Sequence, residues 1–191
     1  SVFSLLGSIL LDLVFRIVFL AFGLDSRGGV LYRQVRVGLN NTPFIVFKFR
    51  TMRKDADIEL GLTIGNNDER ITKIGKLLRR FKIDELPQLL NVFLGEMSFV
   101  GPRPEVPKYV ALYTERQLKV LSVKPGITDY ASIKFRHENE LLAGSPSPEE
   151  YYINEVMPHK LGLNLFYVKN QSFILDIKLI FKTIIFIFVK T

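Results

Sequence analysis

The chain has 191 residues, a formal net charge of +7 and a sequence pI near 9.6, which predicts one domain with a modest core plus a membrane segment, without room for a second catalytic domain. The positive charge suits anionic partners, and nucleic acid, acidic lipid headgroups and diphosphate substrates all qualify. The absence of cysteine excludes disulfides, thiolate metal sites and cysteine nucleophiles, while two distant histidines, His137 and His159, argue against a zinc site or a histidine triad.

The first predicted element is a membrane-embedded helix. Residues 2–24 are almost wholly apolar, and a helix that spans a bilayer needs about 20 such residues. Asp12 and Arg16 lie in the middle of the stretch, where each charge costs roughly 2.5–3.5 kcal/mol on insertion scales. A spanning helix and a helix that enters and returns on the same side both remain open. The sequence lacks the basic region and cleavage site of a signal peptide.

A β-hairpin is expected next. The stretches 30–37 and 44–49 are separated by an Asn-rich turn at 38–43. Lys48 and Arg50 would project from the end of the hairpin, and solvated strand ends are their ordinary interpretation.

Residues 70–82 then predict a basic amphipathic helix, after a brief helix over 52–60 and a polar loop over 61–68. Apolar side chains recur at helical spacing, so one face is buried and the basic side chains lie mostly on the other. The apolar positions are Ile71, Ile74, Leu77, Leu78 and Phe81, and the basic ones include Arg70, Lys73, Lys76, Arg80 and Lys82.

A carboxylate pair, Asp84 and Glu85, follows where a second helix is expected to start. Asp84 occupies the N-cap position, Pro87 falls in the first turn, and apolar residues recur after it. Free N–H groups and the helix dipole would favour an anion beside Asp84. Further along, residues 101–104 read Gly-Pro-Arg-Pro, which cannot continue a helix and would hold Arg103 on a stiff loop. The ordinary alternative is a solvated cap beside a solvated basic face.

The C-terminal half predicts more helix. We expect a helix over 105–121, a loop over 145–148 followed by a polar helical stretch, and an apolar helix with lysines over 172–190. The last suits an interfacial helix on anionic lipid, and a buried terminal helix is the alternative. The predicted fold class is α+β, predominantly helical with a small β-hairpin.

Five segments together resemble the bacterial sugar transferase family: YRQVRVG at 32–38, KFRTM at 48–52, DELPQ at 84–88, MSFVGPRP at 97–104 and KPGIT at 124–128. Members are monotopic polyprenyl-phosphate phosphoglycosyltransferases, which initiate many bacterial glycan pathways. The resemblance implies transfer of a phosphosugar from a UDP-sugar to polyprenyl phosphate with release of UMP, the first membrane step of polysaccharide or glycoconjugate synthesis. It also implies the cytoplasmic face of the bacterial inner membrane as the location.

The resemblance also implies roles for individual residues. The family's nucleophile maps onto Asp84, which would form an aspartyl-phosphosugar adduct, and Glu85 matches its second carboxylate. Metal ligand, proton acceptor and orienting group all stay open as roles of Glu85. Arg79 and Arg103 match the family's phosphate-binding arginines. Because a carboxylate that approaches a diphosphate meets like charge, Mg²⁺ held by Asp84 and Glu85 is the expected cofactor.

Four further residues are candidates for substrate binding. The family places the hairpin near its active site, so Lys48 and Arg50 are expected to bind substrate phosphate. Arg136 and His137 follow the stretch where the resemblance thins, and they are expected to contact the nucleoside or the sugar.

The resemblance divides the chain into a membrane-embedded helix at 1–25, a catalytic domain at 26–170 and an amphipathic membrane-surface helix at 171–191. It implies a re-entrant first helix broken by Ser-Pro, whereas this chain has Asp12-Leu13 at that place. The chain starts with Ser and lacks the family's basic signature ahead of the helix, which indicates further residues upstream.

The expected partners are a UDP-sugar, polyprenyl phosphate and membrane lipid, without nucleic acid, and a homodimer is left open. One alternative is a membrane-anchored basic module that binds anionic lipid or nucleic acid without catalysis, in which Asp84 and Glu85 only cap a helix. Another is a family member that has kept the fold and lost activity. The four residues Asp84, Glu85, Arg79 and Arg103 argue against the second alternative.

Overall fold

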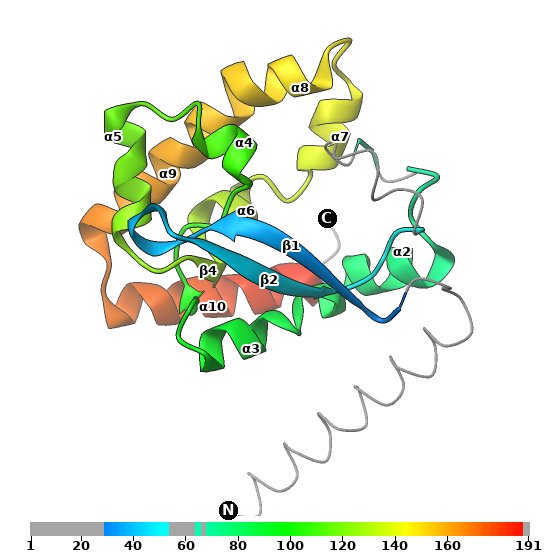
Figure 1. Cartoon of the computed structure of the whole chain (residues 1–191), viewed down its shortest axis with the longest axis horizontal. Coiled ribbons are helices and arrows are strands. Elements are labelled where there is room, and N and C mark those ends of the chain that lie inside the picture. The colour runs from blue at the N-terminus through cyan, green and yellow to red at the C-terminus, as the bar shows by residue number, and fades with distance from the viewer. Residues whose placement is uncertain (1–28, 54–63, 66–67, 189–191) are drawn as a thin grey trace, which may run out of the picture.

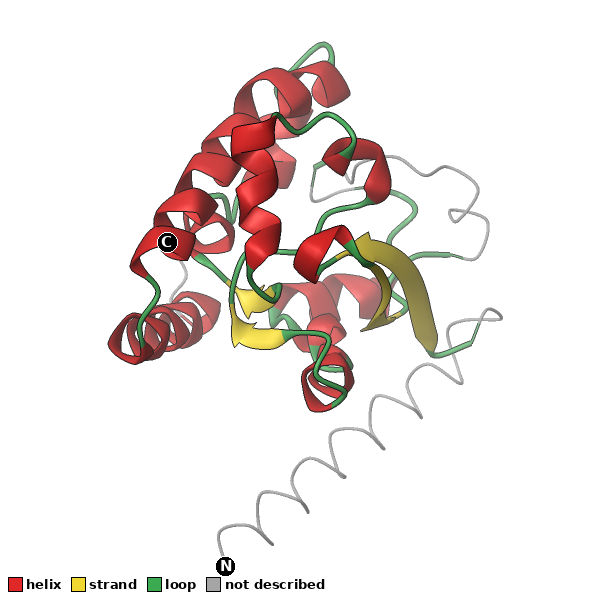
Figure 2. Cartoon of the chain, turned by 60° about the vertical axis from the view of Figure 1, so that its left-hand side comes forward, coloured by secondary structure: helices red, strands yellow, loops and turns green. Residues whose placement is uncertain are grey.

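The computed structural model describes residues 29–53, 64–65 and 68–188 (Figure 1). Within them, short helices surround two small two-stranded sheets, which Figure 2 shows as separate pairs of strands. The predicted mixed fold, mostly helical with a small hairpin, is confirmed for this part of the chain. The helix expected over 1–25 and most of the brief helix expected over 52–60 lie outside the described residues.

The predicted hairpin is confirmed. Strands β1 (Leu31–Val37) and β2 (Pro43–Phe49) pair antiparallel. Asn40 and Asn41 in the turn have φ of 53° and 60°, a left-handed conformation that asparagine tolerates better than most residues. Val46 is buried, and Lys48, two residues further along β2, lies on the same face of the strand.

Helix α2 (Lys73–Arg80) confirms the basic amphipathic helix, with bounds shorter than expected. Its N-cap is Thr72, whose Oγ1 accepts a hydrogen bond from the Gly75 N–H at 2.9 Å. The helix ends because Lys82 takes a left-handed conformation with φ of 57°.

The expectation that Asp84 caps a second helix is wrong. Ile83–Glu85 form a 3₁₀ turn, and α3 (Gln88–Phe93) starts only after Pro87, without a side-chain cap. The N–H groups of Glu85 and Leu86 donate to the carbonyls of Lys82 and Ile83. They are therefore unavailable for the anion that a helix start would have attracted.

The single helix expected over 105–121 is also wrong. The segment forms α4 (Pro107–Val110), α5 (Glu115–Leu118) and a 3₁₀ turn at Lys119–Ser122. Thr114 starts a new helix because it forms a capping box with Gln117. The loop over 145–148 and the polar helix after it are confirmed. The following helices are α6 (Tyr130–Lys134), α7 (Glu138–Ala143), α8 (Pro148–Tyr151), a π-helical segment (Tyr152–Val156) and α9 (Met157–Asn170).

A second sheet, which the sequence did not predict, fixes two loops beside each other. Strands β3 (Ser98–Val100) and β4 (Gly126–Thr128) pair parallel. A Cβ at Gly126 would lie 2.1 Å from the backbone nitrogen of Gly101, so this close approach requires glycine. The sheet thereby brings the loop that follows β3 next to the start of α6.

The C-terminal helix α10 (Phe173–Phe188) has features of both expected forms. Its Leu179 is buried in a cluster with Val100 and Tyr167, and the helix contacts β3, β4 and α6. The other side exposes apolar side chains, among them Phe173, Ile174, Phe181, Ile184 and Ile185. Among the helices of the described ranges, none combines the length and the apolar character needed to cross a membrane.

We expect Gly75→Ala to destabilise the fold. A Cβ at this position would lie 2.2 Å from the Thr51 carbonyl oxygen, so α2 would have to move away from the strand end that carries Thr51. Overpacking of this kind costs about 1–3 kcal/mol, and thermal unfolding should show a Tm lowered by about 2–4 °C per kcal/mol.

Gly162→Ala is the matched control. It lies in α9, where a Cβ would meet nothing within 4 Å, so the gain in helix propensity should leave Tm unchanged or raise it. An unchanged Tm for Gly75→Ala would contradict the close packing of α2.

Candidate active site

One large cleft of about 1440 Å³ contains all the predicted site residues. Its walls come from the hairpin, α2, the 3₁₀ turn at Ile83–Glu85, the loop after β3 and helices α6, α7, α9 and α10. The predicted residues that line it are Lys48, Arg50, Arg79, Asp84, Glu85, Arg103, Arg136 and His137. Segments far apart in the sequence thus bring Asp84, Glu85 and several cations to one space.

Glu85 lies at the centre of an ion triad. Arg103 binds its carboxylate with two nitrogens: Nη1 donates to Oε2 at 3.1 Å and Nη2 to Oε1. Lys48 Nζ lies 3.5 Å from Oε1. Although burial opposes ionisation, Arg103 and Lys48 hold the pKa of Glu85 well below its usual range. Both of its oxygens are therefore engaged, and Glu85 is an anion that orients two cations.

Asp84 has the opposite environment. Its side chain is buried, with 8% of the residue exposed, and Oδ1 has no hydrogen-bond partner among the described residues. Burial and then the neighbouring charge of Glu85 raise the pKa of Asp84, and Lys48, Lys82 and Arg79 oppose them only in part. Adjacent carboxylates whose pKa values move apart are typical of sites with divided chemical roles. Asp84 is the carboxylate left available for a ligand.

Arg79 is held toward the carboxylates by the strand end. Its Nε donates to the Thr51 hydroxyl at 2.8 Å, and burial lowers its pKa while Asp84 and Asp68 raise it. Arg50 lies with its guanidinium carbon 5.5 Å from the ring centre of Tyr32, an aromatic contact that orients a cation. Both arginines thus have fixed positions in the wall of the cleft.

The loop that carries Arg103 is anchored by Asp129, a residue whose role sequence reasoning missed. Asp129 is fully buried. Its Oδ2 accepts a hydrogen bond from the Arg103 N–H at 3.0 Å, and its Oδ1 caps α6 by accepting from the Ser132 N–H at 2.5 Å. The signal that could have found it is the Asp before a short helix, which is an N-cap pattern.

A second missed anchor lies on the other side of the loop. Arg36 on β1 donates from Nη1 to the Pro104 carbonyl at 3.1 Å and to Glu105 Oε1 at 3.0 Å. Tyr152 donates to the other oxygen of Glu105. Burial raises the pKa of Glu105, but Arg36 and Lys160 lower it below its usual value. An ionised network therefore fixes the loop to the hairpin.

Arg136 and His137 lie at the exposed end of the cleft. Arg136 Nε donates to His137 Nε2 at 2.9 Å, and its guanidinium carbon lies 5.1 Å from the ring centre of Phe186 on α10. His137 Nδ1 is 3.3 Å from a carboxylate oxygen of Glu140. The structure therefore places this pair in the same cleft as Asp84 but among other partners.

Asp84 fits a divalent ion better than Glu85 does. Mg²⁺ is usually bound by one or two carboxylates together with substrate phosphates and water. The orphaned Oδ1 of Asp84 suits this pattern, whereas both oxygens of Glu85 are engaged by cations. The described residues contain no group of three or more metal-ligating side chains.

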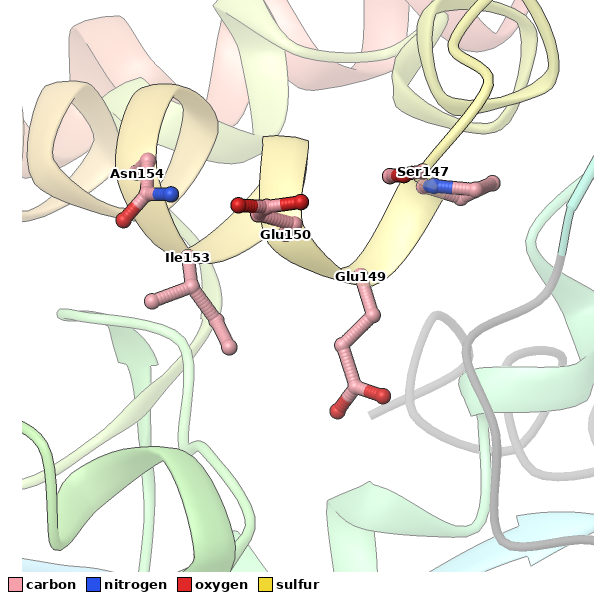
Figure 3. Close-up of a pocket in the computed structure, with 6 residues that line it drawn as sticks. Ser147, Glu149, Glu150, Ile153 and Asn154 are labelled. Carbon is pink, nitrogen blue, oxygen red and sulfur yellow. The ribbon is translucent and has the colours of Figure 1, made fainter.

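A smaller hollow of about 480 Å³ lies beside α8 and the start of the π-helical segment (Figure 3). It is lined by Ser147, Pro148, Glu149, Glu150, Ile153 and Asn154. Glu149 is paired with Lys108 and accepts a hydrogen bond from the Tyr109 hydroxyl at 3.3 Å. None of its lining residues lines the large cleft, so it adds nothing to this site.

Comparison with known proteins gives the family. Residues 1–190 match the family described as bacterial sugar transferase. The chain is 43% identical over 155 residues to an uncharacterized sugar transferase, EpsL, of Bacillus subtilis, which covers 81% of this chain and 68% of that protein. The chain therefore belongs to the bacterial sugar transferase family, and the predicted resemblance is confirmed.

Two longer relatives have names that describe a reaction. The chain is 42% identical over 193 residues to an undecaprenyl-phosphate glucose phosphotransferase of Komagataeibacter xylinus, covering 95% of this chain and 34% of that protein. It is 36% identical over 181 residues to a UDP-glucose:undecaprenyl-phosphate glucose-1-phosphate transferase of Klebsiella pneumoniae, and the match covers 92% of this chain and 36% of that protein. The chain thus spans about a third of the length of these two relatives.

We expect Asp84→Asn and Glu85→Gln to change stability in opposite directions. Asp84→Asn removes a buried charge whose pKa is raised, so at neutral pH it should raise the free energy of unfolding by roughly 1 kcal/mol. That gain should vanish as the pH falls through the Asp84 pKa, because the wild-type carboxyl is then neutral too.

Glu85→Gln should instead lower the free energy of unfolding by roughly 3 kcal/mol, since it leaves Arg103 and Lys48 close together without their anion. Urea unfolding of both variants at pH 7 and pH 4 measures these differences. Destabilisation by Asp84→Asn at pH 7 would contradict the environment described for Asp84.

Proposed function

We propose that this chain transfers a phosphosugar from a UDP-sugar to polyprenyl phosphate through a covalent adduct on Asp84, with release of UMP. The observation that carries the proposal is the contrast between the two carboxylates. Asp84 is buried and one of its oxygens has no hydrogen-bond partner within the described part of the chain, whereas both oxygens of Glu85 are bound by cations. A solvated helix cap would have neither property. The names of the relatives support the substrate class.

In the first step, a carboxylate oxygen of Asp84 attacks the phosphorus that carries the sugar. A bond forms between that oxygen and phosphorus, and the bond from phosphorus to the bridging oxygen breaks. UMP leaves with the bonding electron pair, and the phosphosugar stays on Asp84 as an acyl phosphate. The approach needs an ionised carboxylate, which the cations in the cleft supply by opposing the raised pKa of Asp84.

In the second step, a phosphate oxygen of the polyprenyl phosphate attacks the same phosphorus. The new bond gives polyprenyl-diphosphate-sugar, and the bond to Asp84 breaks, which restores the carboxylate. Both substrates thus use one nucleophile in turn. A two-step exchange of this kind gives ping-pong kinetics.

The cations around Asp84 would hold the diphosphate. Arg103 and Lys48 bind Glu85 in this structure, and a diphosphate offers the same negatively charged oxygens to their remaining N–H groups. Arg79 and Arg50 extend the positive wall. Mg²⁺, bound through Asp84 and the phosphates, would supply further neutralisation of charge. Glu85 acts in this proposal chiefly as the orienting group for Arg103 and Lys48.

The membrane would supply the second substrate. Undecaprenyl phosphate, named in the relatives, is a lipid, and the exposed apolar side of α10 suits contact with a lipid surface. We propose that residues 1–25 lie in the membrane and residues 171–191 lie on its surface. The catalytic domain, residues 26–170, would lie at the cytoplasmic face of the bacterial inner membrane. Family membership gives no support to the alternative of a non-catalytic basic module.

We expect the full chain to release UMP when given polyprenyl phosphate, Mg²⁺ and its UDP-sugar, tested from a panel. Asp84→Asn should lower the rate by at least about 1,000-fold because the nucleophile is gone, and chelation of Mg²⁺ should stop release by the wild type. Peptide mass spectrometry of enzyme given UDP-sugar alone should detect the phosphosugar on Asp84.

Glu150→Gln, an exposed carboxylate outside the cleft, is the matched control and should keep the wild-type rate. Equal UMP release by wild type and Asp84→Asn, or none with any UDP-sugar, would contradict the proposal.

We also expect an alkaline limit set by Lys48. Burial lowers its pKa from 10.5 to about 8, against the charge of Glu85, so Lys48 loses its proton and its attraction for phosphate as the pH rises through about 8. The pH profile of kcat/KM for the UDP-sugar, which reports the free enzyme, should fall there. Lys48→Arg stays protonated and should move the fall to higher pH. Identical profiles would exclude Lys48 as the titrating group.

A further inference from the structure

One buried face of α9 contains a polar residue, Asn164, where an apolar side chain is expected. Met157, Leu161, Asn164 and Tyr167 follow one another at helical spacing and are all buried. The first two belong to one apolar cluster and Tyr167 to another, so Asn164 lies between them with only 5% of its surface exposed. A buried amide is unfavourable unless it is hydrogen-bonded, whereas an apolar side chain would suit this position.

The amide oxygen of Asn164 has no such bond. Oδ1 is buried and has no hydrogen-bond partner among the residues that the structure describes, and the same holds for the hydroxyl oxygen of Ser132. Ser132 lies on α6, which packs against α9. Both residues line the cleft that contains Asp84. Two orphaned polar groups therefore come from neighbouring helices of one cleft.

Another buried asparagine shows what a structural role looks like here. Asn91 is fully buried, and its side chain accepts from the Phe47 N–H at 3.2 Å and donates to the Ile45 carbonyl at 2.7 Å and to Glu96 at 2.8 Å. Its amide is used by the fold itself. Among the described residues, Asn164 has no comparable partner for its oxygen, which indicates that the partner comes from outside them.

One of the orphaned groups is linked to the loop of the proposed phosphate site. One carboxylate, that of Asp129, accepts from the backbone N–H of both Arg103 and Ser132. The start of α6 and the loop of Arg103 are thus tied together, and Asn164 faces the cleft from the helix packed on α6. A substrate whose phosphate is bound by Arg103 would share one cleft with both orphaned groups.

We propose that Asn164 and Ser132 form a polar subsite that hydrogen-bonds a ring hydroxyl of the nucleotide sugar. Asn164 Oδ1 accepts from the hydroxyl, and the Ser132 hydroxyl completes its hydrogen bonding with the same ring. The inference rests on the proposed function and deepens it, because it assigns residues that read the sugar part of the substrate. Hexose and ribose both offer such hydroxyls, and the experiment separates them.

The test compares Asn164→Leu and Ser132→Ala with wild type by calorimetry on the full chain in detergent. The probes are UDP-glucose, UDP-galactose, their N-acetylamino forms, and UDP without a sugar. Loss of one neutral hydrogen bond should weaken binding of the tightest UDP-sugar by roughly 3- to 10-fold, while Tm stays unchanged or rises because a buried unpaired amide is removed. A loss confined to UDP-sugars assigns the hydroxyl to the hexose, and an equal loss with UDP assigns it to the ribose.

Asn91→Leu is the matched control, and its Tm should fall. If Asn164→Leu lowers Tm as Asn91→Leu does, or if both site variants bind every probe as tightly as wild type, the subsite is overturned while the proposed transfer stands. If wild type binds no UDP-sugar and releases no UMP, both proposals are overturned.

Discussion

The ion triad of Glu85, Arg103 and Lys48 is the interaction on which the site depends. It joins three segments that are distant in sequence: the second strand of the hairpin, the 3₁₀ turn and the loop after β3. Arg103 and Lys48 are both partly buried, and burying either charge would cost free energy without the shared anion Glu85. Because Lys48 is paired with Glu85, it opposes the raised pKa of the neighbouring Asp84 only in part. Asp84 is buried, and its Oδ1 has no hydrogen-bond partner in the part of the chain that the structure describes, because Arg103 and Lys48 contact Glu85 instead.

The tight turn makes this division possible. Adjacent residues in a 3₁₀ turn project in different directions, so one carboxylate contacts the cations while the other keeps an unpartnered oxygen. Burial and then the charge of Glu85 raise the pKa of Asp84, and Arg103 and Lys48 keep Glu85 charged. In the proposed reaction, the negative charge of the diphosphate competes with Glu85 for Arg103 and Lys48. The incoming charge is therefore neutralised by cations that are already in the cleft.

Behind the triad, buried polar groups hold the loop of Arg103 from both sides. Asp129 binds its backbone and the start of α6, while Arg36 and Glu105 bind it to the hairpin. Satisfied networks of this kind fix geometry, which is what a site needs if a guanidinium is to meet a phosphate at a set distance. Within the described ranges, buried side-chain oxygens of Asp84, Ser132 and Asn164 have no hydrogen-bond partner, and all three residues line the cleft.

The sequence by itself determined the family, the hairpin, the basic helix and the residues that gather at the cleft, because these rest on local patterns and on short motifs. It did not determine the start of α3 or the pairing of β3 with β4, since a left-handed Lys82 and a contact between two glycines decide them. The division of 105–121 has a local signal, the capping box of Thr114 and Gln117, which the prediction of one helix missed. Only the tertiary structure decided which carboxylate is saturated and which is left open. That outcome depends on whether Arg103 and Lys48, distant in the chain, reach Glu85 or Asp84, and no local pattern encodes that choice.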